Sequence, residues 1–456
     1  NQTTLVLALA NNNRFFTHNY SVKIIFIKGY LVIQSTAINN SQTTLKTTEF
    51  DRDRFDQSVM STYGRFPIAI DKGEGCRLWD TQGKEYLDFV AGIATCTLGH
   101  AHPALIKAVT EQINKLHHVS NLYYIPEQGQ LAEWLVNHSC MDKVFFCNSG
   151  AEANEAAIKL VRKYAHTHLD KVDNPIILTA KASFHGRTLA TITATGQEKY
   201  QQGFGPLLPG FAYVTYNDIT AIENAITDLD EGTLSRVVGI MIEPLQGEGG
   251  VRPGELEYFL RLRKICDENN ILLVFDEVQV GIGRSGKFWG YEKLGIEPDI
   301  LTSAKGLAGG IPIGAMLCKD SCAVFEPGNH ASTFGGNPFA CAAALAVLQT
   351  LAEENILQNV QQRGEQLRVR LRAIAHKYPH LFTEVRGWGL INGIELRSDI
   401  ELTSIQLVKA AMEQGLLLVP AGLKVLRFVP PLIVSEQEVN QAVSILETVI
   451  MQNQFN

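Results

Sequence analysis

Four short, mainly apolar runs mark the central part of the chain: residues 143–146, 175–179, 237–243 and 271–276. Apolar runs without alternation are typical of strands buried on both faces of a parallel sheet, whereas a half-exposed strand alternates. Stretches with a helical pattern separate the four runs. We therefore expect an α/β protein in which helical crossovers join parallel strands.

Both flanks of this region carry a different pattern. Residues 75–89 alternate around an Asp-Thr-Gln-Gly turn, which predicts a hairpin, and after Phe339 an alanine-rich helix leads into mixed strands and helices. A chain of 456 residues is too long for one ordinary core. We place a large domain at 105–345 and expect a smaller α+β domain to combine 51–104 with 346–456.

The first 50 residues differ from the rest in composition. No acidic residue precedes Glu49, while Asn, Thr and Ser are abundant. The apolar patches at 5–10 and 24–27 are too short to span a membrane. We expect residues 1–50 to be a disordered or removed leader, either an organelle transit peptide or translated upstream sequence. The expected location is the cytoplasm, with an organelle matrix as the alternative.

Charge and composition argue against several kinds of partner. The net charge of −7, the pI near 6.0 and the lack of a dense Lys/Arg run argue against nucleic-acid binding. Eight cysteines without a CxxC pair predict scattered thiols in a reducing compartment. The pairs His100/His102 and His166/His168 have no nearby ligands at metal-site spacing, so we expect no metal.

An acid and a lysine follow the last of the apolar runs. Asp276 ends that run, at the strand end where open α/β sheets bind ligands. Lys305 follows in a segment of small residues, Thr-Ser-Ala-Lys-Gly, which leaves room for a large ligand. This pair suits pyridoxal 5′-phosphate (PLP), which the lysine would bind as a Schiff base while the acid pairs with the pyridine nitrogen. Taken alone, the two residues also fit a capped strand end and a surface lysine.

A second motif predicts a helix that begins with small residues. Ser149, Gly150 and Ala151 stand between a predicted strand and a strong helical pattern. The free N–H groups and the dipole of such a helix end favour an anion. An ordinary serine N-cap would also explain this segment alone. Beside an Asp/Lys pair in the same sheet, a phosphate site is favoured.

Residues 281–286 match the GxGxxG pattern of dinucleotide-binding proteins. That fingerprint requires the glycines to turn directly from a strand into a helix. Here Asp276–Val280 intervene, and the following Lys-Phe-Trp-Gly is a poor helix start. We therefore do not expect a dinucleotide site.

Two arginines have the surroundings of anion-binding groups. Arg187 lies in a turn of small residues after a predicted strand, and Arg427 interrupts an apolar stretch. A buried guanidinium needs an anionic partner. For Arg427 that partner is either a protein acid, with Glu248 as the candidate, or a substrate carboxylate bound bidentately. A plain ion pair stays open for each arginine.

Five motifs follow one another in a fixed order: Asn148–Asn154, Phe184–Thr188, Glu243–Gly250, Asp276–Gln279 and Ser303–Gly306. The set resembles the class III PLP-dependent aminotransferases of fold type I over about residues 60–450. Within the family the chain is most similar to members acting on N-acetylornithine, with support from Thr62–Pro67 and Thr333–Pro338. The resemblance implies a large domain whose mainly parallel seven-stranded sheet is flanked by helices.

The resemblance also implies roles around the cofactor ring. Lys305 would bind PLP covalently and then move the proton between substrate and cofactor. Asp276 would keep the pyridine nitrogen protonated. Gln279 would bond to the ring hydroxyl group, and Phe184 would stack on the ring.

For the cofactor phosphate, the resemblance implies binding by Ser149, Gly150 and Ala151. Thr333 of a neighbouring subunit would reach the same phosphate. Two sites built across one interface imply an obligate homodimer with shared active sites.

The implied reaction transfers the terminal amino group of N-acetylornithine to 2-oxoglutarate. Arg187 would bind the α-carboxylate of acetylornithine and the side-chain carboxylate of glutamate, while Arg427 would bind the α-carboxylate of glutamate. Glu248 would neutralise Arg427 when acetylornithine is bound, and Tyr63 would contact the substrate. Ornithine, 4-aminobutyrate and succinylornithine are alternative donors. A PLP-fold aminomutase or a non-catalytic binding protein is the alternative from another class.

Overall fold

The computed structural model describes residues 20–27, 30–37, 50–169, 172–230 and 235–453. The chain forms two compact units, residues 1–65 and residues 66–456. The first unit contains an antiparallel hairpin of β1 (Tyr20–Ile27) and β2 (Tyr30–Ala37), and the helix α1 (Arg52–Ser58). Much of the expected leader, residues 1–50, lies outside the described residues, so its disorder or removal stays a prediction.

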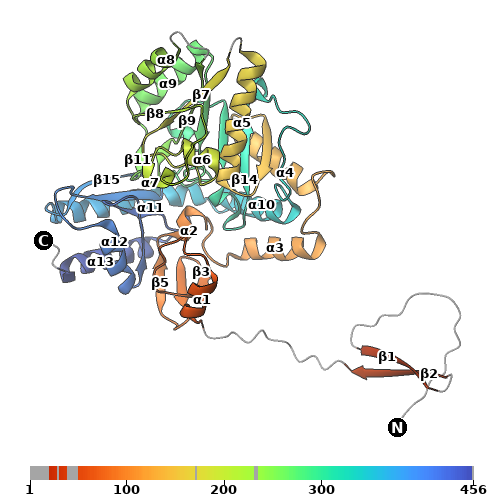
Figure 1. Cartoon of the computed structure of the whole chain (residues 1–456). Coiled ribbons are helices and arrows are strands. Elements are labelled where there is room, and N and C mark those ends of the chain that lie inside the picture. The colour runs from red at the N-terminus through yellow and green to blue at the C-terminus, as the bar shows by residue number, and fades with distance from the viewer. Residues whose placement is uncertain (1–19, 28–29, 38–49, 170–171, 231–234, 454–456) are drawn as a thin grey trace. The chain divides into compact units, whose positions relative to one another are not determined.

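A seven-stranded sheet forms the centre of the second unit (Figure 1). Its strands stand in the order β6–β14–β13–β12–β9–β7–β8. Their bounds are Lys143–Cys147 (β6), Asn174–Ala180 (β7), Phe211–Val214 (β8), Ser235–Ile242 (β9), Leu272–Asp276 (β12), Ile300–Ser303 (β13) and Gly314–Cys318 (β14). β14 runs antiparallel to both its neighbours and the other pairs are parallel, so the predicted sheet is confirmed.

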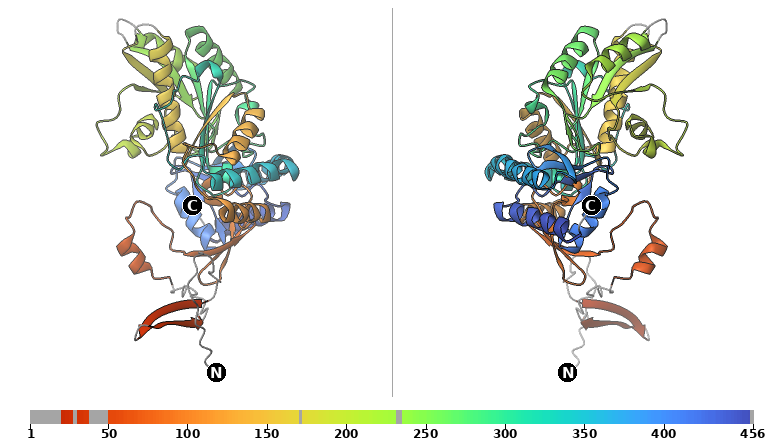
Figure 2. Two further views of the ribbon diagram at one scale, coloured as in Figure 1. Left: turned by 90° about the vertical axis from the view of Figure 1, so that its right-hand side faces the viewer. Right: turned by 90° about the vertical axis from the view of Figure 1, so that its left-hand side faces the viewer.

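Both faces of this sheet are covered by helices (Figure 2). On β12, Leu272 and Val274 pack in one apolar cluster with α5 (Gly150–His168). The alternate residues Leu273 and Phe275 pack in the other cluster with α9 (Leu256–Asn269). Because successive side chains of a strand point to opposite faces, two apolar coverings require an apolar run without alternation.

The remaining elements around this sheet are shorter or peripheral. They are α2 (Ala91–Ala94), α3 (Pro103–Lys115), α4 (Pro126–Asn137), α6 (Leu189–Ala194), α7 (Glu198–Gln201), α8 (Ile219–Asp230), α10 (Pro338–Glu353), β10 (Leu245–Gln246), β11 (Arg252–Pro253), and the 3-10 turns η1 (Tyr291–Lys293), η2 (Lys305–Ala308) and η3 (Asp320–Cys322). No single helix among the described residues has the length and apolar composition of a membrane span. The pair α10 and α11 (Ile356–Lys377) meets that test only together, across a bend of 72°.

Two four-stranded sheets lie outside the central one. Their strands and helices are β3 (Ile70–Glu74), β4 (Arg77–Asp80), β5 (Glu85–Asp88), β15 (Phe382–Trp388), β16 (Ile391–Leu396), β17 (Leu416–Leu417), β18 (Val419–Pro420), β19 (Val425–Phe428), α12 (Ser404–Glu413) and α13 (Glu436–Asn453). The antiparallel pair β4–β5 confirms the predicted hairpin. β17 pairs with β5, so a strand from the segment 346–456 and strands from the segment 51–104 share one sheet. The exact domain bounds stay a prediction.

Candidate active site

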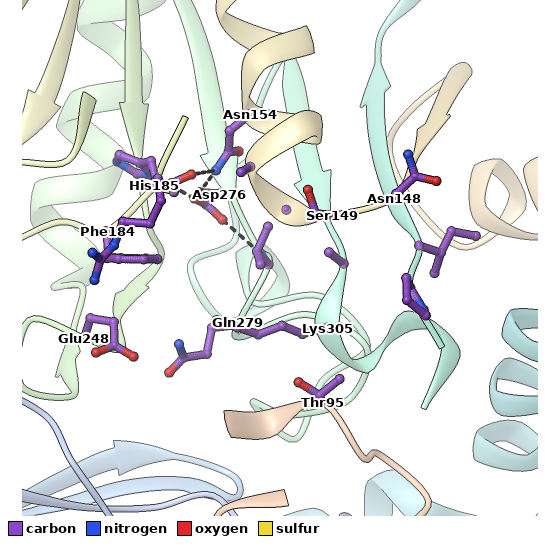
Figure 3. Close-up of a pocket in the computed structure, with 18 of the residues that line it drawn as sticks. Thr95, Asn148, Ser149, Asn154, Phe184, His185, Glu248, Asp276, Gln279 and Lys305 are labelled. Carbon is purple, nitrogen blue, oxygen red and sulfur yellow. Dashed lines mark hydrogen bonds and ion pairs between the residues drawn. The ribbon is translucent and has the colours of Figure 1, made fainter. Parts of the chain in front are cut away.

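A cavity of about 440 Å³ opens at the carboxyl ends of the parallel strands (Figure 3). Its walls come from the segments that follow β6, β7, β9, β12 and β13, from the segment that precedes the antiparallel strand β14, and from Thr95 in the segment after β5. Open α/β sheets bind ligands at this edge, because the strand ends bring side chains from distant parts of the chain together. The predicted site residues that line the cavity are Ser149, Gly150, Ala151, Phe184, Arg187, Glu248, Asp276, Gln279 and Lys305.

Asp276 is buried at the end of β12, with both carboxylate oxygens held by the protein. Its Oδ2 accepts a hydrogen bond from Asn154 Nδ2 at 2.8 Å and lies 2.8 Å from His185 Nδ1. Its Oδ1 accepts from the backbone N–H of Val278 at 3.0 Å. Asn154 is oriented in turn by the hydroxyl of Thr302, which donates to its Oδ1 at 2.7 Å. A carboxylate oxygen can accept two hydrogen bonds, so Oδ1 retains capacity for one more donor.

Lys305 begins the 3-10 turn η2, two residues after the end of β13, and it lines the same cavity. Its backbone has φ +38°, a left-handed conformation that non-glycine residues rarely adopt and that is common at functional sites. Desolvation lowers the pKa of Lys305 below its ordinary value, although the nearby Glu248 acts in the opposite direction. A lowered pKa increases the fraction of neutral amine, which is the nucleophilic form.

Helix α5 begins at the cavity with the predicted small residues. Ser149 is its N-cap, and the Ser149 side chain accepts from the backbone N–H of Glu152 at 3.2 Å. A Cβ atom at Gly150 would lie 2.7 Å from Val278 Cγ1, so only glycine lets the helix start approach the strand end this closely. The ordinary N-cap is therefore present. The first N–H groups of a helix have no partner within the helix, and Gly150 and Ala151 line the cavity.

Arg427 on β19 is fully buried and donates to two residues of the cavity wall. Its Nη2 donates to Glu248 Oε1 at 2.7 Å, and its Nη1 donates to Gln279 Oε1 at 2.8 Å. Burial alone would raise the pKa of Glu248, but the charges of Arg427 and Lys305 together hold it below its ordinary value. The protein acid is thus the partner of Arg427 in this structure.

Arg187 is exposed and stacks on an aromatic pair. Its guanidinium carbon lies 3.9 Å from the ring centre of Tyr200 and 5.4 Å from that of Phe184. The two rings meet edge to face with centroids 5.8 Å apart. The stack orients Arg187 without using its hydrogen-bond donors, so these stay available to an anion. Sequence reasoning missed Tyr200, whose only signal is an aromatic residue shortly after the arginine.

Two predicted residues stand elsewhere. Thr333 is exposed and lines a different cavity, of about 630 Å³, that does not contain Lys305. Tyr63 belongs to the first unit, where Arg65 lies 5.4 Å from its ring centre, and 74% of Tyr63 is exposed. The roles expected of both residues stay predictions.

Sequence reasoning also missed three polar residues of the site. Asn154 and His185 fix Asp276, and both lie inside motifs quoted above without a role of their own. Glu243 ends the apolar run of β9 as Asp276 ends that of β12, which is the signal that could have found it. It is buried in the cavity wall and accepts from the backbone N–H of Phe184 at 3.3 Å. Burial, with the charge of Asp276, raises the pKa of Glu243 well above its ordinary value.

The glycine segment 281–286 forms a turn that, as predicted, does not open a helix; the 3-10 turn η1 follows it. Arg284 in this turn is buried and donates to the backbone carbonyls of Leu390, at 3.0 Å, and Pro430. These bonds tie the turn to the C-terminal part of the chain.

Comparisons with known proteins agree with this geometry. The family model for aminotransferase class III matches residues 59–450. An acetylornithine aminotransferase of Nostoc sp. is 74% identical over 401 residues, which cover 88% of this chain and 93% of the relative. The N-acetylornithine aminotransferase structure from Stenotrophomonas maltophilia has a TM-score of 0.74 at 39% identity, covering 86% of this chain and 98% of that one.

An ornithine aminotransferase from Toxoplasma gondii is similar as well, with a TM-score of 0.83 at 33% identity, covering 89% of this chain and 95% of that one. A further structure of the Toxoplasma enzyme has PLP at partial occupancy in its active site. The chain belongs to the class III aminotransferases, and its cofactor is PLP.

The residues at the cavity fit that cofactor. A half-buried lysine of lowered pKa suits a carbonyl carbon, and an aspartate with one free acceptor position suits a protonated ring nitrogen. The start of α5, where Gly150 admits close approach, suits a phosphate. We expect Lys305, Asp276 and Ser149–Ala151 to hold these three parts of PLP.

The raised pKa of Glu243 predicts a pH-dependent stability. Between its ordinary pKa near 4.5 and its raised folded value, the unfolded chain releases a proton that the folded chain keeps. Stability therefore falls as the pH rises, by about 1.4 kcal/mol for each pH unit in that window. Glu243→Gln removes this loss. The melting-temperature advantage of Glu243→Gln in cofactor-free protein should grow from pH 5 to pH 8.

A matched control is Glu257→Gln, which changes an exposed acid on α9. Its melting temperature should follow that of the parent protein at every pH. An advantage of Glu243→Gln that stays constant over this range would mean that Glu243 is ionised in the folded protein.

Proposed function

We propose that this chain transfers the terminal amino group of N2-acetyl-L-ornithine to 2-oxoglutarate. The products are N-acetylglutamate 5-semialdehyde and L-glutamate, and the reaction belongs to arginine biosynthesis. The observation that carries this proposal is the pairing of buried Arg427 with Glu248 beside an exposed Arg187. The names of two similar proteins, from Nostoc sp. and Stenotrophomonas maltophilia, support the same donor.

The chemistry divides between cofactor and protein. When bound, PLP supplies an electron-withdrawing ring that stabilises negative charge on the carbon next to the donor's nitrogen. Asp276 would hold the ring nitrogen protonated through the acceptor position left on its Oδ1. Lys305 would take the proton from the substrate carbon and return it, a task that requires a neutral amine.

The two arginines would allow one site to bind two substrates that differ in their number of carboxylates. Acetylornithine carries one carboxylate, whereas glutamate and 2-oxoglutarate carry two. Arg187, which lines the cavity, would bind the α-carboxylate of acetylornithine in one half-reaction and the side-chain carboxylate of glutamate in the other. Arg427 would bind the second carboxylate of glutamate, and Glu248 would take its place when acetylornithine is bound. A buried guanidinium thus keeps a negative partner in both half-reactions.

Alternative reactions differ in what they require of this pair. Ornithine, 4-aminobutyrate and succinylornithine could each donate to the same cofactor, and an ornithine aminotransferase is among the similar structures. An aminomutase needs only one carboxylate site, so the presence of both Arg187 and Arg427 argues against it. A non-catalytic binding protein would not need both Lys305 and Asp276 at the cavity.

Half-reaction kinetics without an acceptor separate the donors. The visible absorption of the bound cofactor should change fastest, at equal low concentration, with acetylornithine. Ornithine, succinylornithine and 4-aminobutyrate serve as competitors in the same assay. A larger specificity constant for any of these three would overturn the proposed donor, and a spectrum unaffected by every amine would overturn the transaminase activity.

Glu248→Ala should shift the balance between the two half-reactions toward glutamate. In Glu248→Ala, the α-carboxylate of glutamate no longer has to displace a protein carboxylate from Arg427. When acetylornithine is bound, in contrast, the guanidinium of Arg427 has no anionic partner. We expect the ratio of the two specificity constants to change by about tenfold, or about 1.4 kcal/mol. Glu248→Gln, which keeps the shape and loses the charge, should shift the ratio in the same direction by less.

If the ratio is unchanged in Glu248→Ala, the neutralising role of Glu248 is wrong. Melting temperatures of both variants are needed beside the kinetics. Removing one member of a buried ion pair can cost about 3–5 kcal/mol of stability.

We also propose a homodimer in which Thr333 completes the partner's site. In support, the loop that contains Thr333 and the loop that precedes α4 carry exposed apolar side chains: Phe334 (59% exposed) in the first, and Leu122 (85%) and Tyr124 (fully exposed) in the second. Asn121 Nδ2 ties these loops together by donating to the carbonyls of Ser332 and Gly335, at 3.2 and 2.9 Å. Exposed apolar patches of this kind mark protein–protein contacts.

A charge in this patch should break the dimer. Tyr124→Glu should sediment as a monomer and lose transaminase activity together with the interface. Leu260→Glu, on the exposed face of α9, is the control and should stay dimeric and active. A Tyr124→Glu protein that stays dimeric would place the interface elsewhere.

The cellular location is proposed on chemical grounds. All eight cysteines are free thiols, and six of them are buried. Free thiols in this number suit a reducing compartment, and we propose the cytoplasm.

A further inference from the structure

The segment that joins β5 to α3 contains a turn of four consecutive residues with left-handed backbone. Ala91, Gly92, Ile93 and Ala94 have φ of +49°, +63°, +63° and +62°. The turn is closed by backbone bonds from the N–H of Ala94 to the carbonyl of Val90, at 3.0 Å, and from Thr95 to Ala91, at 2.7 Å. Left-handed helical geometry costs L-residues about 1–2 kcal/mol each, and three of these four are not glycine. Something in the protein must hold the turn in this form.

Asp88 makes the contacts that hold it. Its side chain is buried, and its Oδ1 accepts from the backbone N–H groups of Val90 and Ala91, at 2.9 and 2.8 Å. Its Oδ2 lies 2.7 Å from His100 Nε2. His100 is itself fixed, because its backbone exchanges hydrogen bonds with Gly75 on the neighbouring hairpin. Asp88 thus connects the entry of the turn to the sheet beside it.

Packing holds only one side of the turn. Ala91 and Ala94 are buried, whereas Gly92 and Ile93 are exposed and line a cavity of about 660 Å³. This cavity is separate from the one that contains Lys305. It offers space into which the turn could move if its hydrogen bonds were lost. The bonds to Asp88 therefore oppose a relaxation that neighbouring side chains do not block.

The residues after the turn reach the active-site cavity. Thr95 lines that cavity, close to Lys305 in Figure 3. Thr97 is buried, and its hydroxyl donates to the carbonyl of Gly306 at 2.7 Å. A Cβ atom at Gly306 would lie only 2.8 Å from the Thr97 hydroxyl oxygen, so the two segments are in direct contact. Gly306 follows Lys305, whose own backbone is left-handed.

We propose that Asp88 is a positioning residue for transamination. By holding the left-handed turn, it sets Thr95 in the cavity wall and, through Thr97 and Gly306, the backbone beside Lys305. The inference rests on the aminotransferase activity but not on the identity of the donor. Misplacement of a reacting amine by a fraction of an ångström is enough to slow a proton transfer that depends on alignment.

Three variants of the full-length, cofactor-loaded protein test this proposal. Asp88→Ala removes all three contacts, and Asp88→Asn keeps an acceptor for Val90 and Ala91. The control is Asp80→Ala. Asp80 is also buried, and it caps the hairpin turn by accepting from the backbone N–H groups of Gln82 and Lys84, both at 2.9 Å. Asp80 does not line the active-site cavity.

We expect Asp88→Ala to lower the maximal half-reaction rate by about tenfold or more and to raise the half-saturating donor concentration. Asp88→Asn should recover the rate to within about threefold of the parent, and Asp80→Ala should lower the melting temperature with a rate within about twofold. Cofactor content, measured by absorbance after denaturation, separates slow chemistry from lost cofactor. Asp88→Ala with a parental rate, or Asp88→Asn as slow as Asp88→Ala, would overturn the proposal.

If Asp88→Ala does not fold, Thr97→Val carries the test. It keeps the volume of the side chain and removes the hydrogen bond to Gly306. We expect a rate lowered by about fivefold, with the half-saturating donor concentration changed much less. A rate equal to that of the parent would refute the link to Lys305. Each rate is compared with the parent on whichever donor it uses best, so a wrong donor does not decide the result.

Discussion

Asp276 ends a strand that is buried on both faces, and the protein already engages both of its carboxylate oxygens. Its position follows from the sheet, because β12 is central and its carboxyl end opens into the cavity. The orientation of its side chain follows from Asn154 and His185, which both contact Oδ2 at hydrogen-bond distance. One acceptor position is then left on Oδ1 for the ring of the cofactor. The other elements of the site are arranged around this fixed carboxylate.

The ionisable groups of the site, Arg427 among them, influence the protonation of Lys305, Glu243 and Glu248. Lys305 loses proton affinity through desolvation, and Glu243 gains it through burial beside Asp276. Arg427 and Glu248 compensate each other at 2.7 Å. The pKa shifts favour the neutral forms of Lys305 and Glu243, for which the structure shows no ion pair among the residues it describes, and the charged form of Glu248, which is paired with Arg427. A substrate carboxylate that displaces Glu248 therefore exchanges one ion pair for another.

Sequence reasoning located the parts of the site that depend on local pattern. The apolar runs became β6, β7, β9 and β12, and the small-residue helix start became the N-terminus of α5. Strands β8, β13 and β14 were not singled out, because segments of four or five residues give little periodic signal. The cofactor class followed from the ordered motifs together.

Contacts between distant segments could not be predicted in the same way. His185 and Asp276 are 91 residues apart, and Glu248 and Arg427 are 179 apart. For Arg427 the sequence left a protein acid and a substrate carboxylate both open, and only the packing of β19 against the cavity wall brings Glu248 within reach. The left-handed turn Ala91–Ala94 had no signal either, because alanine favours the right-handed helix.

The central claim is that the terminal nitrogen of acetylornithine passes to 2-oxoglutarate at this site. Isotope tracing tests it most directly, with acetylornithine labelled by ¹⁵N at the δ-nitrogen in one experiment and at the α-nitrogen in another. The account predicts that the δ-label is recovered in glutamate and that the α-label stays in N-acetylglutamate 5-semialdehyde. Glutamate that carries the α-label, or no labelled glutamate in either experiment, would contradict it.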